Sequence, residues 1–290
     1  MPVEGQYLKW GIEQRMEFIE FRLFWEGGVN RSDITSFFGV SVPQASKDLT
    51  RYQEIAPGNA EYDKSEKKYF AAAGFKPAFL APNAETYLSR LVRTLEHEGS
   101  PNWLLRTPAV DFLPTLQRRV DVPVLRTILS ALRKNTSMEV LYQSMNPARP
   151  EPAWRCISPH AFGNDGLRWH VRAYCHIDNK FKDFLLSRCE GARLTGDGGV
   201  APAEDTVWTE FFDVSLAPNP RLSEAQQKAI AIDYGMVNSV LTVPVRKAML
   251  YYFGKRLRLD LAEKLDHPKE TPVVILNRVD FEQTLAEASR

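Results

Sequence analysis

Apolar residues recur every three or four positions near the start of the chain, between Tyr7 and Trp25, and charged residues separate them. This spacing predicts an amphipathic helix with one face in a core. Gly27 and the glycine after it end the helix, and either Asn30 or Ser32 can cap a short second helix. The chain is therefore expected to begin with two helices of unequal length.

A third helix is expected from Ser41 to about Gln53, after a turn at Gly39. Pro43 suits its first turn, where a backbone N–H has no partner inside the helix. The pattern divides this helix into a packing side and a polar side. The expected packing side is Val42, Ala45, Leu49 and Tyr52, and the expected polar side is Ser41, Gln44, Lys47, Asp48 and Arg51.

Two strand-like runs around a polar tip at 64–67 follow the third helix, after a break at Pro57. They predict a β-hairpin. A hairpin directly after a helix-turn-helix is a wing, and the order of these elements predicts a winged helix-turn-helix. A further helix is expected at 83–98, so we assign residues 1–100 to an N-terminal winged helix-turn-helix domain.

The rest of the chain predicts a linker and two mixed domains. Prolines mark 101–120 as a linker that crosses between domains or between subunits. A capped helix and several alternating strand-like runs fill 121–200 and predict a small barrel or a strongly bent sheet. The glycine-rich tract 196–205 is expected to be a flexible linker, and 205–290 mixes strand and helix signals. The predicted fold class is therefore α+β.

Polar and basic side chains of the third helix suit the major groove of DNA, which accepts an α-helix and displays base-specific donors and acceptors. Gln44 can form two hydrogen bonds with adenine, and Lys47 and Arg51 can neutralise phosphates or bind guanine. Lysines of the hairpin would contact the DNA backbone or the minor groove. The predicted DNA contacts are Ser41, Gln44, Ser46, Lys47 and Arg51 in the helix and Lys64, Lys67 and Lys68 in the hairpin.

The overall charge gives no support to nucleic-acid binding, because the formal net charge is only +1. Acidic residues at Glu61, Asp63 and Glu66 also dilute the charge of the hairpin. The alternative is a structural helix-turn-helix whose polar face is only solvated, in a protein-interaction module or one that binds RNA or single strands. Such a protein would show no salt-sensitive affinity for duplex DNA.

A strand over 167–174 would alternate its faces between a core and a polar side. Arg188 follows on the next strand-like run, close to several aromatic residues. Convergent cations beside aromatic rings favour a pocket for a phosphate-bearing or nucleic-acid ligand. A structural pairing of Arg172 with Asp183 is the alternative. The expected core side is Trp169, Val171 and Ala173, and the polar side is Arg168, His170, Arg172 and Tyr174.

Four short runs carry a resemblance to a known family. The triplet Trp169-His170-Val171 and the run LLSRC at 185–189 resemble the WYL-domain transcriptional regulators, whose sensor domain is an Sm-like β-barrel. His170 stands where that family has a tyrosine. The runs YQS at 142–144 and ISPHAFG at 157–163 resemble the BrxR and CapW repressors found beside bacterial anti-phage systems.

This resemblance covers nearly the whole chain and implies a domain plan and a function. It implies a central Sm-like WYL barrel at 121–200 and a small α+β dimerisation domain at 205–290. The expected protein is a homodimer that binds an inverted-repeat operator in double-stranded DNA, represses a phage-defence operon and is released by a nucleic acid or nucleotide. The implied sensor pocket is Tyr142, Ser144, His160, His170, Arg172 and Arg188.

The sequence argues against catalysis and against a bound metal or cofactor. The five histidines are scattered, the three cysteines form no metal-binding pair, and no phosphate-binding or nucleophile motif occurs. A nuclease that uses His170 with nearby arginines would lack a carboxylate cluster for a metal ion. No apolar run is long enough to cross a bilayer, so the expected location is the cytoplasm.

Overall fold

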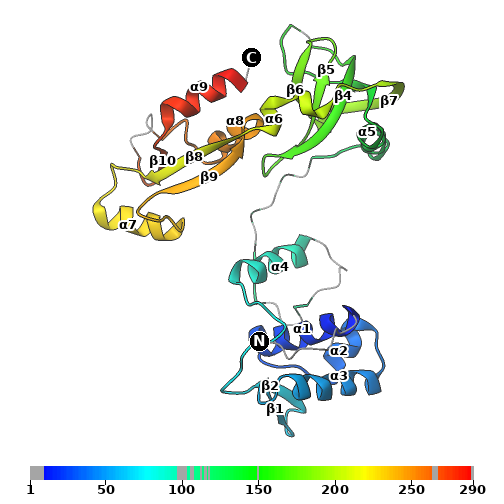
Figure 1. Ribbon diagram of the computed structural model, residues 1–290, viewed down its shortest axis with the longest axis vertical. Helices are drawn as coiled ribbons and strands as arrows, with labels where there is room; N and C mark the ends of the chain where they lie inside the picture. The colour runs from blue at the N-terminus through cyan, green and yellow to red at the C-terminus, as the bar shows by residue number, and fades with distance from the viewer. Residues whose placement is uncertain are drawn as a thin grey trace. The chain divides into compact units, whose positions relative to one another are not determined.

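The structure is a computed structural model that describes residues 10–96, 103–104, 108–111, 113, 116, 118–148, 150–262 and 267–288 (Figure 1). The chain divides into two compact units, Met1–Pro114 and Thr115–Arg290, and each is described by itself. Parts of the predicted linker at 101–120 lie outside the described residues. So do positions 7–9 and 97–98 of two predicted helices.

The first unit is a winged helix-turn-helix, with the elements in the predicted order. Asn30, and not Ser32, caps the second helix: its side chain accepts from the N–H of Asp33, whose carboxylate accepts from the N–H of Asn30. Gly39 ends this helix with a φ of 64°, which glycine adopts without strain. The elements are α1 (Trp10–Trp25), α2 (Arg31–Phe38), α3 (Val42–Ile55), β1 (Ala60–Asp63), β2 (Lys68–Ala71) and α4 (Ala84–Glu96).

A buried carboxylate holds the chain after the wing against α1 and α3. Glu20 is fully buried, and its two oxygens accept hydrogen bonds from the backbone N–H groups of residues 78–80 at 2.7 to 3.0 Å. The hydroxyl of Tyr52 donates to the same carboxylate at 3.1 Å. Burial and the neighbouring Glu20 raise the pKa of Tyr52. Several donors on one carboxylate offset the cost of burying its charge.

Two positions of α3 lie on the opposite side from the one predicted. Asp48 is buried, with 2% of its surface exposed, and Val42 is 55% exposed. Both residues flank the packing stripe of the helix, so the pattern alone cannot decide which of them turns inward. Arg15 of α1 decides it, because it supplies a partner for the buried carboxylate of Asp48. The predicted sides were wrong for these two residues.

The second unit begins with a helix against an antiparallel sheet. Asp121 caps this helix by accepting from the N–H of Val124 at 3.1 Å. Apolar residues of the helix and of the inner sheet face, including Ile128, Met138 and Ile157, form the core. The elements are α5 (Val122–Lys134), β3 (Thr136–Tyr142), β4 (Ala153–Asn164), β5 (Trp169–Cys175), β6 (Lys180–Leu185), the 3₁₀ turn η1 (Leu186–Arg188) and β7 (Cys189–Gly198).

The sheet is open, and a closed barrel is not observed. The strand order is β6-β5-β4-β3-β7, and across the described strands no pairing joins β6 to β7. Instead, α5 contributes Val124, Ile128 and Ala131 to the core that the sheet partly encloses. A helix that covers the apolar face removes the need for the two edge strands to meet. Of the two forms predicted for 121–200, a small barrel or a strongly bent sheet, the closed barrel is therefore not the one observed.

The C-terminal part mixes strands and helices, as predicted for a small α+β domain (Figure 1). Its three-stranded sheet has the order β10-β8-β9. Its core includes Val214, Leu216, Leu250 and Phe281. No helix in the described ranges is long and apolar enough to cross a membrane. The elements are η2 (Pro202–Glu204), α6 (Thr206–Thr209), β8 (Phe211–Pro218), α7 (Glu224–Asp233), β9 (Leu241–Arg246), η3 (Lys247–Met249), α8 (Leu250–Arg256), β10 (Val273–Ile275) and α9 (Arg278–Ala288).

The tract 196–205 is ordered, contrary to the prediction of a flexible linker. Strand β7 continues to Gly198, and Asp205 is only 1% exposed. Asp205 caps α6 by accepting from the N–H of Trp208 at 3.1 Å. The prediction rested on the glycine and alanine content of the tract, and it did not take into account that Asp205 has partners distant in sequence.

Candidate DNA interface and sensor site

Helix α3 presents a polar outer face. Ser41 caps the helix, and its Oγ accepts from the N–H of Gln44 at 3.4 Å. Ser41 and Lys47 are exposed, while Gln44, Ser46 and Arg51 are half-buried. The five predicted helix contacts therefore remain accessible from the solvent side. A shallow hollow on this face is lined by Ser46, Lys47, Thr50, Arg51 and Glu54.

The inner edge of that face carries a polar network. The Nε2 of Gln44 donates to the Oδ1 of Asp48 at 3.0 Å. The Nε and Nη2 of Arg15 donate to the two oxygens of Asp48 at 2.6 and 3.3 Å. Helix α1 thus supports a side chain that the sequence assigned to base contact.

The tip of the wing presents two of its three predicted lysines. Lys64 and Lys67 are exposed. The Oδ1 of Asp63 shapes the tip by accepting from the N–H and the Oγ of Ser65 at 2.7 and 2.5 Å and from the N–H of Glu66 at 3.1 Å. These hydrogen bonds lower the pKa of Asp63. The tip is therefore held by its own aspartate, with Lys64 and Lys67 directed to solvent.

Lys68 differs from the other two lysines, because only 8% of its surface is exposed. Its ammonium lies over the ring of Phe70, 5.6 Å from the centroid. Its stem runs beside Gly28, where an added Cβ would lie 2.9 Å from the Cε of Lys68 and 2.4 Å from the carbonyl oxygen of Tyr69. Glycine at 28 therefore makes room for Lys68 under the hairpin, and the structure does not present Lys68 with the other two.

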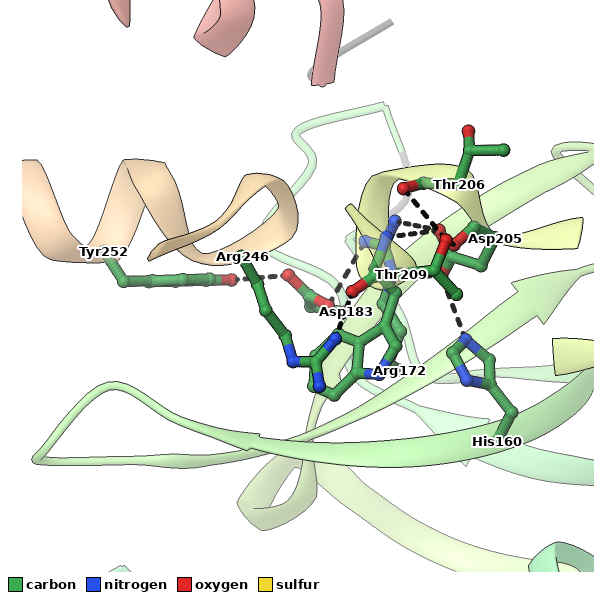
Figure 2. A network of polar contacts seen from close by, with 9 residues as sticks. His160, Arg172, Asp183, Asp205, Thr206, Thr209, Arg246 and Tyr252 are labelled. Atoms are coloured by element: carbon green, nitrogen blue, oxygen red, sulfur yellow. Dashed lines mark hydrogen bonds and ion pairs between the residues drawn. The ribbon is translucent and has the colours of Figure 1, made fainter. Parts of the chain in front are cut away.

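A second polar cluster joins the sheet to the C-terminal part of the second unit (Figure 2). The Nε and Nη2 of Arg172 donate to the two oxygens of Asp205 at 2.7 and 3.1 Å, and His160 Nε2 lies 2.9 Å from Asp205 Oδ2. The β4–β5 register shifts between Pro159 and Ala161, so His160 occupies a bulge. A bulge turns the side chain of the extra residue, and here it brings His160 to the same carboxylate as Arg172.

Asp183 and Tyr252 extend this cluster. Arg172 Nη1 donates to Asp183 Oδ1 at 3.3 Å, and the hydroxyl of Tyr252 donates to Asp183 Oδ2 at 3.1 Å. Burial raises the pKa of Asp205, but hydrogen bonds from His160 and Arg172 outweigh it and lower that pKa to about 2. Burial and the nearby Asp183 raise the pKa of Tyr252. Arg172 of the predicted pocket is thus matched by two carboxylates, and one of these contacts is the Arg172–Asp183 pair foreseen as the structural alternative.

His170 lies on the same face of β5 as Arg172, as predicted, and is 5% exposed. Its Nε2 lies 3.3 Å from Asp165 Oδ2, and its ring packs against Tyr252 with a centroid distance of 4.8 Å. Burial raises the pKa of Asp165, but hydrogen bonds from the 167–168 backbone, Arg168 and His170 lower it to about 2. Val171 and Ala173 lie in the core, as predicted, but the prediction was wrong for Trp169, which is 55% exposed at the start of the strand.

The other three predicted pocket residues make different contacts. The hydroxyl of Tyr142 accepts from the N–H of Leu185 at 3.3 Å. The Oγ of Ser144 accepts from the N–H of Asn146 at 3.1 Å. The carbonyl of Arg188 accepts from the N–H of Gln143 at 3.0 Å. The structure therefore brings His160 and Arg172 together on Asp205 and His170 against Tyr252, and gives each of the other three a separate partner.

An open cavity of about 440 Å³ lies beside the Arg172 cluster. Arg172, Lys180 and Lys182 contribute cationic groups to its wall, and Tyr174 and Phe181 contribute rings. The same wall carries four carboxylates, those of Asp183, Glu204, Asp205 and Glu287. The cations and rings favour a ligand that carries a phosphate and a ring, whereas the carboxylates oppose an anion. Within the described ranges, no group of three or more His, Cys, Asp or Glu side chains could hold a metal ion.

Sequence reasoning missed Asp205 and Tyr252. Asp205 stands at the end of a tract of small residues, and its one local signal is the cap that it forms on the short helix α6. Tyr252 is one of several aromatic residues on α8, and its hydrogen bond to Asp183 spans 69 positions. No local pattern distinguishes such a residue from a core aromatic.

Three family models match separate parts of this chain. The winged helix-turn-helix domain of the BrxR transcriptional regulator matches residues 11–93. The WYL domain matches residues 123–194, and the BrxR C-terminal dimerization domain matches residues 211–281. Together the matches cover both units.

Curated relatives align over nearly the full chain. The DNA-binding transcriptional repressor CapW of Escherichia coli strain KTE188 is 38% identical over 278 residues, which cover 94% of this chain and 91% of that protein. CapW of Pseudomonas aeruginosa is 38% identical and CapW of Stenotrophomonas maltophilia 36% identical, each over 97% of this chain and 94% of the relative.

A solved structure, the proteasome accessory factor B/C of Arthrobacter aurescens, aligns over 96% of this chain and 48% of that chain with 16% identity. This chain thus spans about half its length. The TM-score of 0.26 is too low to support an inference.

Proposed function

Since this chain belongs to the family of BrxR and CapW transcriptional regulators, we propose that it is a homodimeric, DNA-binding transcriptional repressor. The observation that carries the proposal is the outer face of α3, where a capped helix presents Gln44, Lys47 and Arg51 beside a wing. This arrangement is the one by which a recognition helix enters the major groove. The function requires no catalysis, and its partner DNA lies in the bacterial cytoplasm.

The proposed contacts divide into base and phosphate contacts. Gln44 contacts a base, and Ser41, Ser46, Lys47 and Arg51 contact bases or phosphates around it. Lys64 and Lys67 at the wing tip contact the DNA backbone, where each neutralised phosphate adds salt-dependent affinity. Lys68 supports the wing from inside, because its side chain is buried.

The proposed homodimer places two recognition helices on an inverted-repeat operator, since two-fold symmetry in the protein matches two-fold symmetry in the DNA. The C-terminal domain supports this proposal through its match to a dimerization domain. It also exposes large apolar side chains, among them Ile232 at 80% and Val237 at 74%. Exposed apolar groups of this size commonly mark protein interfaces.

The sensor part of the proposal concerns the cavity beside Arg172. We propose that a nucleic acid or nucleotide binds there and releases the repressor from its operator, and that this operator precedes a phage-defence operon. Arg172, Lys180 and Lys182 supply the positive charge for phosphate groups, and Phe181 supplies a ring surface. His170, Tyr142, Ser144 and Arg188 are proposed to extend the site along the same sheet.

Binding of the full-length protein to DNA from upstream of its own gene tests the proposed function. Fluorescence anisotropy with a labelled duplex should show tight binding that weakens steeply as salt rises. A scrambled duplex and a single-stranded RNA of equal length serve as controls. Equal affinity for all three, or preference for the RNA, would contradict a duplex-specific repressor and favour the single-strand-binding alternative.

A further inference from the structure

The side-chain amide of Gln44 is tied to one neighbour on its own helix. Gln44 and Asp48 are four positions apart, so both lie on the same side of α3. The Nε2 of Gln44 donates to the Oδ1 of Asp48 at 3.0 Å. Asp48 itself is buried, and Gln44 is half-buried at the edge of the polar face. The base-contacting end of Gln44 is thus attached to a group inside the domain.

Arg15 of α1 prevents the Asp48 carboxylate from turning away. Its Nε and Nη2 donate to both oxygens of Asp48, and its Nη1 donates to the carbonyl of Gly11 at 2.8 Å. The guanidinium is therefore held at two points, by α1 and by Asp48. A planar, bidentate pair of this kind has one preferred geometry.

The chemistry of the carboxylate determines which end of the Gln44 amide faces it. An ionised carboxylate only accepts hydrogen bonds, so the amide nitrogen must face Asp48. The Oε1 of Gln44 then turns to the outside, beside the second N–H of the same amide. The outer face of α3 therefore presents one acceptor and one donor in a defined order.

This order distinguishes adenine from guanine. In the major groove adenine displays an N7 acceptor and an N6 donor, whereas guanine displays two acceptors, N7 and O6. An amide with Oε1 outward accepts from adenine N6, but it meets guanine O6 with like polarity. On the basis of the DNA-binding function proposed above, we propose that Asp48 is a positioning residue that makes α3 prefer adenine over guanine at the base pair contacted by Gln44.

The substitution Asp48→Asn tests this role, because it keeps the shape and changes the hydrogen-bonding order. The asparagine oxygen can still accept from Arg15, and its amide nitrogen then donates to Gln44 Oε1. The Gln44 amide must turn over and direct N–H groups toward the base. Selection of binding sites from randomised duplex DNA by the full-length protein should show this change as a preference for guanine, or as no preference.

The measured quantity is the adenine-to-guanine ratio at each selected position. In the wild type one position of each half-site should favour adenine by roughly 5- to 100-fold, the range of one good bidentate base contact. In Gln44→Ala this ratio should fall toward one. In Asp48→Asn it should fall to one or below, while other positions keep their bases.

Two further variants keep the test independent of folding. The double variant Arg15→Met/Asp48→Leu replaces the buried ion pair by apolar side chains, an exchange that proteins often tolerate. It leaves Gln44 without a fixed orientation, so its adenine-to-guanine ratio should also approach one. Tyr52→Phe removes a buried hydroxyl of the same helix that bonds Glu20 and Asn59 and not Gln44, so it should lower the melting temperature and leave the ratio unchanged.

The outcomes separate this inference from the proposed function. A wild-type protein that selects no sequence contradicts the proposed function. A wild-type protein that selects a motif, combined with an unchanged adenine preference in Gln44→Ala or in Asp48→Asn, overturns the inference and leaves the function standing. Loss of the preference in Tyr52→Phe would show that any loosening of the domain has this effect, and it would also overturn the inference.

Discussion

The guanidinium of Arg172 contacts both carboxylate oxygens of Asp205, with Nε at 2.7 Å and Nη2 at 3.1 Å, across 33 positions of sequence. Arg172 belongs to β5, and Asp205 caps the helix that leads into β8. The pair is buried, with 7% of the Arg172 side chain and 1% of the Asp205 side chain exposed. It therefore connects the sheet of the proposed sensor to the domain that matches a dimerization family.

Neutralising Asp205 should destabilise the second unit. Asp205→Asn leaves the buried charge of Arg172 with Asp183 alone, and breaking a buried ion pair from one side costs about 3 to 5 kcal/mol. Urea denaturation of the full chain, followed by circular dichroism, measures this change. Glu204→Gln is the matched control, because Glu204 is exposed and its substitution should alter stability by less than about 0.5 kcal/mol. Equal stability of the two variants would contradict the role of Asp205.

Acid should weaken the second unit through Asp165 and Asp205. Both folded-state pKa values are about 2, below the ordinary value of 3.8. A lowered folded-state pKa contributes stability that is complete above the unfolded-state pKa and is lost as pH falls toward 2. Denaturation at pH 6, 4 and 3 should therefore show stability falling below about pH 4. The free energy of unfolding should fall less steeply with decreasing pH in Asp205→Asn than in the wild type. An equal slope in both proteins would exclude Asp205 as a cause of the acid sensitivity.

Arg172 should be required for release by a ligand. The double variant Arg172→Gln/Asp205→Asn keeps a neutral hydrogen bond between the two positions and removes the charge that a phosphate needs. Short single-stranded DNA and mononucleotides, added to the operator complex, serve as probes. We expect the double variant to need at least about tenfold more probe for release than the wild type, a difference of about 1.4 kcal/mol. Equal release would place the ligand site elsewhere, and Arg188→Ala tests whether it extends that far.

Neighbouring lysines of the wing should behave differently. Lys67→Ala should weaken operator binding and reduce the salt dependence by about one phosphate contact, because Lys67 is exposed at the wing tip. Lys68→Ala should keep the salt dependence and lower the melting temperature instead, since its side chain is buried beside Phe70. Anisotropy titrations at several salt concentrations, paired with thermal melts, measure both effects. A salt dependence reduced equally in both variants would show that Lys68 also contacts DNA.

Glu20 should stabilise the first unit more than the exposed Glu13 on the same helix does. Glu20→Gln removes the charge that accepts from residues 78–80 and places an N–H where only acceptors are useful. The expected loss is about 1 to 3 kcal/mol, the cost of leaving buried hydrogen-bonding groups without partners. Glu13→Gln, an exposed position on the same helix, is the control. A loss no larger than that of the control would contradict the role of the buried carboxylate.

The sequence by itself determined the local elements of the first unit. The caps at Asn30 and Ser41, the turn at Gly39 and the hairpin after α3 depend on residues within a few positions of one another. Side chain to backbone bonds and turn conformations act over that range, so the order of elements and its resemblance to a winged helix could be predicted. The polar face of β5 could be predicted for the same reason, because strand alternation is local.

Only the tertiary structure decided which charged residues turn inward. Asp48 is buried because Arg15 meets it from another helix, and Asp205 is buried because Arg172 and His160 converge on it. A charge can be buried only where a partner compensates it, and in these pairs the partner lies far away in sequence. The open edge of the five-stranded sheet has the same origin, since a separate helix, α5, completes its core. Local patterns contain no information about such partners. The proposed base preference depends on the Arg15–Asp48 pair, and the proposed sensor site is built around the Arg172–Asp205 pair.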